Sequence, residues 1–352
     1  MKNTFFTRIQ QTVQPCHAIL LDIDKKTYQW NQQEALGKQQ IVRLKKSALI
    51  TSTGASTRIE GASLSDTDVE KLLRGVSIDQ FKDRDVHEVQ GYIELLNHAF
   101  EDPKSFPLTE STIKFFHKDL LQYVENDREH LGKYKQKDNT VAMIDGSGKP
   151  IEIIFETTSP WQTPIEMQEL VEWTQSSFLE KTFHPLLLIG NFIVELLHIH
   201  PFTDGNGRLS RILTNLLLMQ QQYFFVQLVS HEHLIEKRKV DYYLSLRNSQ
   251  KTFRGSNPEL QHWMMFFLHI VNEQADLAMN LISKDQLKTQ LSPAAQKILD
   301  FFDSTQGEIT PKQIQAHTQI PRPTINQALN KLLRLGMISR LGQGRATRYR
   351  RV

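Results

Sequence analysis

The feature that most constrains this chain is a helix-loop-helix segment at residues 195–211, Glu-Leu-Leu-His-Ile-His-Pro-Phe-Thr-Asp-Gly-Asn-Gly-Arg-Leu-Ser-Arg. Its apolar first half predicts a helix that ends near His200. Gly205, Asn206 and Gly207 then allow a tight turn with free backbone N–H groups, and they open a second helix. The segment therefore predicts a helical fold with an anion-binding loop.

The side chains of this segment add chemistry to the loop. Free N–H groups and the positive end of a helix dipole favour an anion, and Arg208 and Arg211, three residues apart, can both reach phosphate oxygens. Asp204 is a hard oxygen ligand of the kind that Mg²⁺ shares with phosphates. His200 has an ordinary pKa near neutrality, as a general base needs. Together they predict a triphosphate site beside a base.

Residues 200–211, His-Pro-Phe-Thr-Asp-Gly-Asn-Gly-Arg-Leu-Ser-Arg, resemble the signature of the Fic family. Members of this family transfer AMP from ATP to a hydroxyl side chain of a target protein. The resemblance implies that His200 is the catalytic base and that Asp204 binds Mg²⁺. It also implies that Arg208 holds the leaving pyrophosphate and that Arg211 holds the γ-phosphate.

The glycine turn completes the ATP site that the resemblance implies. Asn206 and the neighbouring N–H groups of Gly205 and Gly207 would cradle the α- and β-phosphates. Doc-like phosphotransfer toxins carry a lysine in place of the second glycine. Because Gly207 is a glycine here, the chain resembles the nucleotidyl-transfer branch, in which the target hydroxyl attacks the α-phosphorus.

A second motif lies far upstream, at residues 56–61, Ser-Thr-Arg-Ile-Glu-Gly. It resembles the inhibitory motif that precedes many Fic domains, with Ser56 and Glu60 at its defining positions. The resemblance implies that Glu60 pairs with Arg211 and takes the place of the γ-phosphate, which predicts an autoinhibited enzyme. The alternative is a helical glutamate that pairs with Arg58 or faces solvent.

The composition favours a cytoplasmic protein of two or three domains. A chain of 352 residues is too long for one ordinary core. Its net charge of +3, from 42 basic and 39 acidic residues, gives no global field that requires a polyanion partner. Cys16 is the sole cysteine, which excludes an intramolecular disulfide and fits a reducing compartment. No signal-peptide run or membrane-spanning apolar stretch is evident, so no membrane partner is expected.

The expected fold is mainly α: a Fic-type helical bundle with a β-hairpin flap, followed by a C-terminal winged helix. Residues 1–105 form an N-terminal region, which begins with a mixed leader of about 45 residues and carries the inhibitory helix at about 52–62. Residues 106–282 form the catalytic core, and residues 290–352 form the winged helix-turn-helix domain.

Two β-prone runs around an Asp-Gly-Ser-Gly turn, at residues 141–155, predict the hairpin. In the Fic fold a hairpin here is the flap, whose edge strand can pair with a target segment, and Ile151 and Ile153 are the candidate docking residues. The alternative is a hairpin that only covers the core. Upstream, Gly132-Lys-Tyr-Lys135 resembles a Gly-x-aromatic-Arg element, but Lys135 replaces the arginine, which argues against a specific role there.

Tyr242 and Tyr243 follow the signature helix in the chain. One of them is expected to contact the adenosine of ATP while the other packs inward, and the family position favours Tyr242 for the nucleotide.

The last sixty residues resemble a winged helix-turn-helix module. The polar composition of residues 283–291 predicts the boundary before this module. In such modules the second helix enters the major groove and the wing contacts the DNA backbone. The candidate DNA contacts are Arg322, Asn326, Arg345 and Arg348. A protein-docking or dimerising module is the alternative.

Three hypotheses follow. The first is an ATP- and Mg²⁺-dependent protein adenylyltransferase that modifies Ser, Thr or Tyr of a target protein. Modification of the enzyme itself is a further expected reaction. The second is an enzyme that removes AMP, with Glu60 positioning water. The third is an ATP-sensing DNA-binding regulator. The family resemblance also suggests a homodimer.

Overall fold

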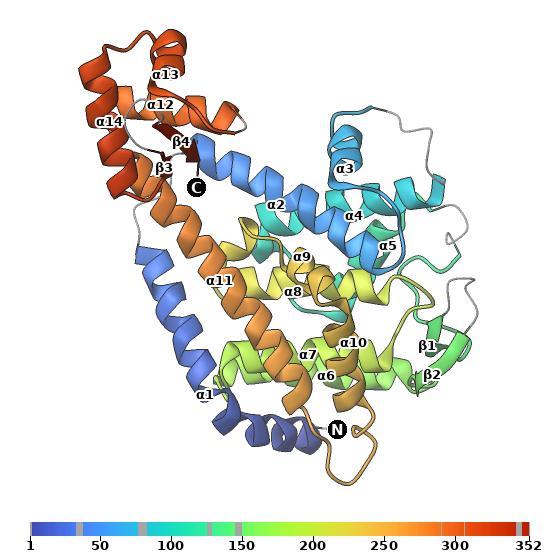
Figure 1. Ribbon diagram of the computed structural model, residues 1–352. Coiled ribbons are helices and arrows are strands. Elements are labelled where there is room, and N and C mark those ends of the chain that lie inside the picture. The colour runs from blue at the N-terminus through green and yellow to red at the C-terminus, as the bar shows by residue number, and fades with distance from the viewer. Residues whose placement is uncertain are drawn as a thin grey trace. The chain divides into compact units, whose positions relative to one another are not determined.

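The computed structural model describes residues 2–32, 38–76, 83–124, 129–144, 150–289, 291–305, 307–342 and 347–351. The chain divides into two compact units, Met1–Ala278 and Met279–Val352. Figure 1 labels their helices and strands. Each unit has its own hydrophobic core and is described by itself.

The first unit is a helical bundle with one hairpin (Figure 1). Its helices are α1 (Lys2–Gln32), α2 (Lys38–Ile59), α3 (Asp66–Leu73), α4 (Asp83–Glu101), α5 (Glu110–Leu120), α6 (Thr163–Glu180), α7 (Pro185–Ile199), α8 (Asn206–Gln220), α9 (His231–Lys237), α10 (Lys239–Gln250) and α11 (Gln261–Thr289), with short 3-10 turns η1 (Pro103–Ser105) and η3 (Phe224–Gln227). Helix α11 continues into the second unit.

Helices α7 and α8 lie at the centre of this unit. All residues of α7 from 186 to 199 are buried, as expected of a helix that is apolar on every side. Helix α8 is buried from residue 208 to 219, and it packs against α4 and α7. The core thus holds the two helices that the signature segment predicts, and the loop between them carries the site.

The predicted mixed leader is wrong. Residues 2–32 form α1, a helix of 31 residues that contains Pro15 and is bent in Figure 1. Proline removes one backbone hydrogen bond and bends a helix without always ending it. What stabilises α1 is a buried apolar face, made of Phe5, Ile9, Cys16, Leu20 and Ile23.

A buried arginine joins α1 to α7. The Arg8 side chain is 1% exposed, its Nε donates to Oδ1 of Asn191 at 2.7 Å, and its Nη2 lies 2.6 Å from Oε2 of Glu195. The guanidinium also lies over the rings of Phe5 and Phe253. Burial lowers the pKa of Arg8, and the Glu195 carboxylate opposes this shift. Either charge alone would be strongly unfavourable in the core, and the ion pair therefore stabilises both.

Replacing Arg8 with Ala leaves Glu195 buried without its partner. We expect the free energy of unfolding to fall by roughly 3–5 kcal/mol, the usual cost of breaking a buried pair on one side. Denaturant unfolding measures this loss, with Arg43→Ala, an exposed arginine of α2, as the matched control. Equal small losses in the two variants would contradict a structural role for the Arg8 pair.

Strands β1 (Thr140–Ile144) and β2 (Pro150–Glu156) pair antiparallel, with Thr140 opposite Glu156 and two irregularities in register. This backbone confirms the predicted hairpin. Its turn at residues 145–149 lies outside the described residues, as do the side chains of Ile151 and Ile153. Their assignment to target docking therefore stays a prediction.

The second unit is a winged helix-turn-helix. It contains α12 (Pro293–Ser304), α13 (Pro311–Thr318) and α14 (Arg322–Arg334), followed by the antiparallel strands β3 (Ile338–Leu341) and β4 (Arg348–Arg351). Ser292 caps α12 through its side chain, as its sequence predicts. The expected boundary segment from Ser283 is helical as far as Thr289, because α11 runs through it.

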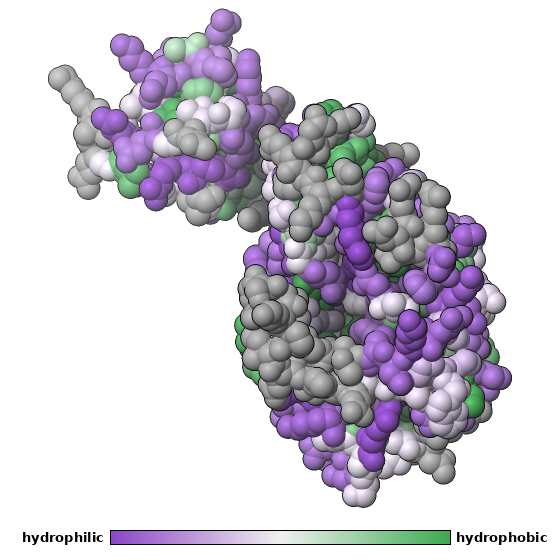
Figure 2. Space-filling view, turned by 90° about the vertical axis from the view of Figure 1, so that its right-hand side faces the viewer, coloured by the Kyte–Doolittle hydropathy of each residue, from purple (hydrophilic) through white to green (hydrophobic). Residues whose placement is uncertain are grey.

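No helix in the described part of the chain is both long and apolar enough to span a membrane. On the face drawn in Figure 2, hydrophilic residues predominate and the hydrophobic residues form small separate areas. The coloured residues of this face therefore present no broad apolar surface.

Candidate active site

The candidate site is the loop between α7 and α8. Helix α7 ends at His200, which adopts the left-handed conformation with φ of 54° and donates its N–H to the carbonyl of Leu196 at 2.9 Å. Glycine is the usual residue at a left-handed helix end, because other residues are strained there. Gly205, with φ of 77°, then caps the start of α8. His200 therefore adopts a strained backbone conformation at the position that places its ring in the loop.

The ring of His200 is half-buried. Its Nδ1 lies 3.2 Å from the carbonyl oxygen of Leu197, which can only accept, so Nδ1 donates and Nε2 retains its lone pair. Burial is the main reason that the pKa of His200 is lowered to about 4. The imidazole is therefore neutral at pH 7 and can accept a proton through Nε2.

We expect the His200 ring to stay neutral as the pH falls from 8 to 5, because burial disfavours the imidazolium form. An NMR titration of the ring, assigned with His200→Ala, measures its pKa directly. A midpoint near the ordinary value of about 6.5 would contradict this environment.

The side chain of Asn206 fixes the loop. Its Oδ1 accepts from the N–H of Phe202 at 3.0 Å, and its Nδ2 donates to the carbonyl of the same residue at 2.8 Å. The residue is 2% exposed. The side chain of Asn206 thus holds the backbone of Phe202 from both sides, and its contact with phosphates stays a prediction.

His117 of α5 holds the other side of the loop, and sequence reasoning missed it. Its ring stacks on Phe202 with centroids 3.9 Å apart, and its Nε2 lies 3.1 Å from the carbonyl oxygen of Asp204. Nδ1 accepts from the N–H of Gly132, so Nε2 carries the proton and donates to Asp204. Burial lowers the pKa of His117 to about 4, which keeps this tautomer neutral. His117 therefore positions the backbone of the predicted metal ligand.

Arg211 of α8 is almost fully buried and faces the end of α2. Its Nε donates to Oγ of Ser56 at 2.8 Å, and its Nη2 donates to the carbonyl of Ser56 at 3.0 Å and to Oε1 of Glu60 at 2.8 Å. Burial by itself lowers the pKa of Arg211, but the Glu60 carboxylate raises it above its ordinary value. Nη1 is buried and makes no hydrogen bond with any described residue. The structure thus brings the two predicted inhibitory residues onto the second signature arginine.

The Glu60 carboxylate also lies against the start of α8. A β-carbon added to Gly207 would be 2.2 Å from Oε1 of Glu60. This position at a helix N-terminus favours an anion. Arg58, the alternative partner of Glu60, instead binds Glu236 through Nε at 2.6 Å and Asp66 through Nη1 at 2.9 Å. Glu60 therefore occupies the anion position of the loop.

Gly207→Ala and Glu60→Ala are expected to remove the same contact, since the new methyl group would displace the carboxylate. Each should cost about 1–3 kcal/mol of unfolding free energy, the usual loss for a buried donor left without its partner. The double variant should cost little more than either single one. Chemical unfolding of the four proteins measures this coupling. Additive losses, such as those expected when Glu60→Ala is combined with Glu70→Ala on α3, would contradict it.

Arg208 lies in a second ion-pair cluster with α4. Its Nη1 is 2.5 Å from Oε2 of Glu88, and its Nη2 is 3.2 Å from Oδ2 of Asp204. Arg84 bridges the same two carboxylates, at 2.9 Å from Glu88 and 2.7 Å from Asp204. Although burial raises the pKa of Asp204, Arg208 and Arg84 lower it overall. Both signature arginines are thus paired with carboxylates, and sequence reasoning missed Glu88 and Arg84.

Asp204 fits a magnesium site of the kind that substrate phosphates complete. Its side chain is 41% exposed and ionised, and among the described residues its Oδ2 pairs with the guanidinium groups of Arg84 and Arg208. Within the described part of the chain no three His, Cys, Asp or Glu side chains gather to hold an ion. One carboxylate with phosphate and water is a usual Mg²⁺ environment, so the residues fit a shared site.

The sequence favours Tyr242 over Tyr243 for the adenosine contact, whereas the structure places Tyr242 inward. Tyr242 is 3% exposed, and its ring packs against Tyr243, Trp263 and Phe266. Burial raises the pKa of its hydroxyl, and nearby Arg211 opposes this shift. Tyr242 is therefore the member of the pair that packs inward, while Tyr243 is half-buried.

In the second unit, α14 turns Ile325, Ala328, Leu329 and Leu332 into the core and exposes Arg322 and Asn326. Arg348 is exposed on β4 and lies 3.8 Å from Glu308. Arg345 lies outside the described residues. The exposed face of α14 thus carries two of the predicted DNA contacts.

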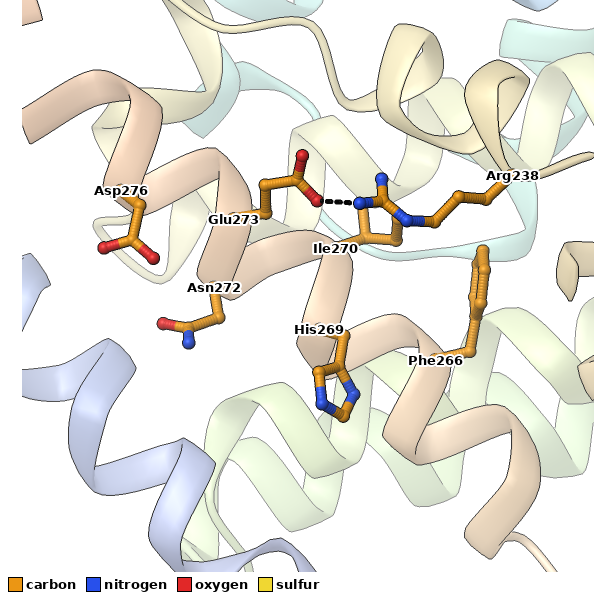
Figure 3. A pocket seen from close by; sticks show the side chains of 7 residues that line it. All are labelled: Arg238, Phe266, His269, Ile270, Asn272, Glu273 and Asp276. Atoms are coloured by element: carbon orange, nitrogen blue, oxygen red, sulfur yellow. Dashed lines mark ion pairs between the residues drawn. The ribbon is translucent and has the colours of Figure 1, made fainter. Parts of the chain in front are cut away.

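A separate pocket of about 380 Å³ lies along α11 (Figure 3). Its lining residues are Arg238, Phe266, His269, Ile270, Asn272, Glu273 and Asp276, and Arg238 pairs with Glu273 at 2.6 Å. The signature residues do not line this pocket. It is therefore distinct from the candidate active site.

Two family profiles match the chain. Residues 107–218 match the Fic/DOC family, and residues 295–342 match the IclR helix-turn-helix domain. The protein adenylyltransferase Fic of Aedes aegypti is 29% identical over 189 residues, which are 51% of this chain and 34% of that protein. The protein adenylyltransferase Fic of Drosophila willistoni is 41% identical over 64 residues, which are 18% and 13% of the two chains. The chain thus spans about a third or less of these relatives.

Solved structures share the fold. A Fic family protein from Desulfovibrio desulfuricans G20 has a TM-score of 0.61 at 20% identity, over 95% of this chain and 96% of that one. Fic-1 from C. elegans has a TM-score of 0.61 at 19% identity, over 78% and 75% of the two chains. The fold is therefore that of Fic proteins. Residues 107–218, which hold the signature loop, are similar to the Fic/DOC family, and residues 295–342 are similar to the IclR helix-turn-helix domain.

Proposed function

We propose that this protein is a protein adenylyltransferase, which transfers AMP from ATP to a hydroxyl side chain of a target protein. The observation that carries the proposal is the loop itself, which joins a neutral histidine to a helix N-terminus and two buried arginines. The adenylyltransferase names of the relatives support it.

In the proposed reaction Nε2 of His200 takes the proton of the target hydroxyl. The freed oxygen forms a bond to the α-phosphorus, and the bond from that phosphorus to the bridging oxygen of pyrophosphate breaks. Arg208 and Arg211 hold the β- and γ-phosphates and stabilise the negative charge of the leaving group. The N–H groups at the start of α8 orient the phosphates.

Magnesium, when bound, would be held by Asp204 and would neutralise phosphate charge. For this, Oδ2 of Asp204 must exchange its contacts with Arg84 and Arg208 for the ion. The guanidinium of Arg208 would then be free on one side for pyrophosphate oxygens.

The described state would be autoinhibited. Glu60 occupies the anion position at Gly207 and the guanidinium of Arg211, so a γ-phosphate cannot take the same place. Release of Glu60 frees Arg211, whereas Arg208 stays paired with Glu88 until ATP binds. The inhibition is therefore an exchange of one anion for another.

Replacing Glu60 with Ala should raise AMP transfer by about tenfold or more, since a charged hydrogen bond of about 1.5–3 kcal/mol no longer competes with ATP. Incorporation of α-labelled ATP with Mg²⁺, into this protein and into a host lysate, measures the gain. Adding His200→Ala to Glu60→Ala should abolish it, because the base is lost.

Glu70→Ala is the matched control, because it removes a glutamate of α3 that pairs with Arg74 of its own helix end and lies far from the loop in sequence. Disappearance of label from a modified target, instead of its appearance, would show an enzyme that removes AMP, with Glu60 positioning water. ATP binding without label in any variant would favour an ATP-sensing regulator.

We also propose that the second unit binds DNA through α14. The exposed Arg322 and Asn326 on one face of this helix support this, as does the match to an IclR helix-turn-helix. Docking of a protein at the same face is the alternative.

Arg322→Ala and Asn326→Ala should each weaken retention on a specific genomic fragment by about 1–3 kcal/mol, the usual value of a base contact. Fluorescence anisotropy at two salt concentrations measures this, with Lys297→Ala on α12 as the control. A DNA affinity that is lost at moderate salt and is unchanged by both substitutions would contradict sequence-specific recognition.

A further inference from the structure

Lys135 holds the backbone on both sides of His200. Its N–H donates to the carbonyl of Pro201 at 2.9 Å, and its Nζ donates to the carbonyl of Ile199 at 3.0 Å. These two carbonyls belong to the residues directly before and after the histidine. One residue therefore fixes the strained peptide segment that carries the base.

The same ammonium group binds both ends of the hairpin. Nζ donates to Oδ1 of Asn139 and to Oγ1 of Thr157, each at 2.7 Å. Asn139 directly precedes β1, and Thr157 directly follows β2. Nδ2 of Asn139 also donates to the carbonyl of Phe202 at 3.1 Å. The hairpin and the signature loop therefore share one hydrogen-bond network.

Stability alone does not account for this lysine. It is 4% exposed, and in the described part of the chain its Nζ contacts neutral oxygens and no carboxylate. Burial lowers the pKa of Lys135 to about 8, although Asp138 and Glu166 oppose this shift. The negative end of α7 offsets part of the cost of an unpaired buried cation, but a neutral side chain would avoid that cost altogether.

We propose that Lys135 is a positioning residue for His200, which locks the base to both ends of the hairpin so that the two form one rigid body. The proposal rests on the adenylyltransferase function and assigns this role to a position where the sequence argued against one. A target segment bound to the hairpin would then lie at a fixed position relative to the ring of His200. The charge of Lys135 also helps to lower the pKa of His200.

The test uses the full chain with Glu60→Ala as the active background. Lys135→Met should lower kcat for pyrophosphate release from ATP by at least about tenfold and change KM for ATP by less than about twofold, since the phosphate-binding arginines are untouched. Lys135→Arg, which restores donors and charge, should recover most of kcat. Lys133→Met, an exposed lysine two residues away, should change neither parameter.

Hydrogen exchange gives a readout that does not depend on activity. Lys135→Met should speed exchange in peptides covering residues 135–144 and 150–157, whereas Lys133→Met should not. If Lys135→Met fails to fold, Thr157→Val removes one partner at nearly constant volume and should lower kcat and speed exchange in part. An unchanged kcat, a loss confined to KM, or unchanged exchange would overturn the proposal. Absence of activity in Glu60→Ala itself would refute the proposed function, while exchange would still test the anchoring.

Discussion

A buried cation is the constraint on which the rest of the site depends. Arg211 is 2% exposed, and a guanidinium does not lose its proton in a protein, so its charge requires an anion close by. Glu60 supplies that anion, and the same carboxylate lies against Gly207 at the start of α8. Any state in which Glu60 leaves must bring another anion to the same place. In the proposed function a triphosphate meets this requirement, which would link nucleotide binding to the position of Glu60.

Much of this site could be predicted because its parts are contiguous. The residues from His200 to Arg211 form one loop and one helical turn, where spacing alone decides which side chains lie together. A local signal was sufficient for the hairpin as well, because its two β-prone runs are adjacent in the chain and pair with each other. The pairing of Glu60 with Arg211 could be predicted only from the family resemblance, because the two residues are 151 positions apart in the chain.

The rest could not be predicted, because it depends on tertiary packing. His117 reaches Asp204 across 87 residues, and Lys135 reaches Ile199 across 64, so no local pattern announces either contact. Whether Tyr242 or Tyr243 packs into the core depends on the rotation of α10 about its axis. Two adjacent tyrosines in a sequence do not indicate that rotation. In α1, Pro15 suggested an irregular leader, although the buried apolar face sustains the helix.

Helix α2 is anchored two residues before Glu60, the residue of the proposed inhibition. Arg58 binds Glu236 of α9 through both Nε and Nη2, two residues ahead of Glu60, and Gly61 follows with φ of 104°. The part of α2 before this anchor need not move for the site to open. In the proposed inhibition only the residues after Arg58 need to move, and short terminal segments open at far smaller cost than whole helices shift. The proposed inhibition would therefore depend on the few residues that follow a fixed point of α2.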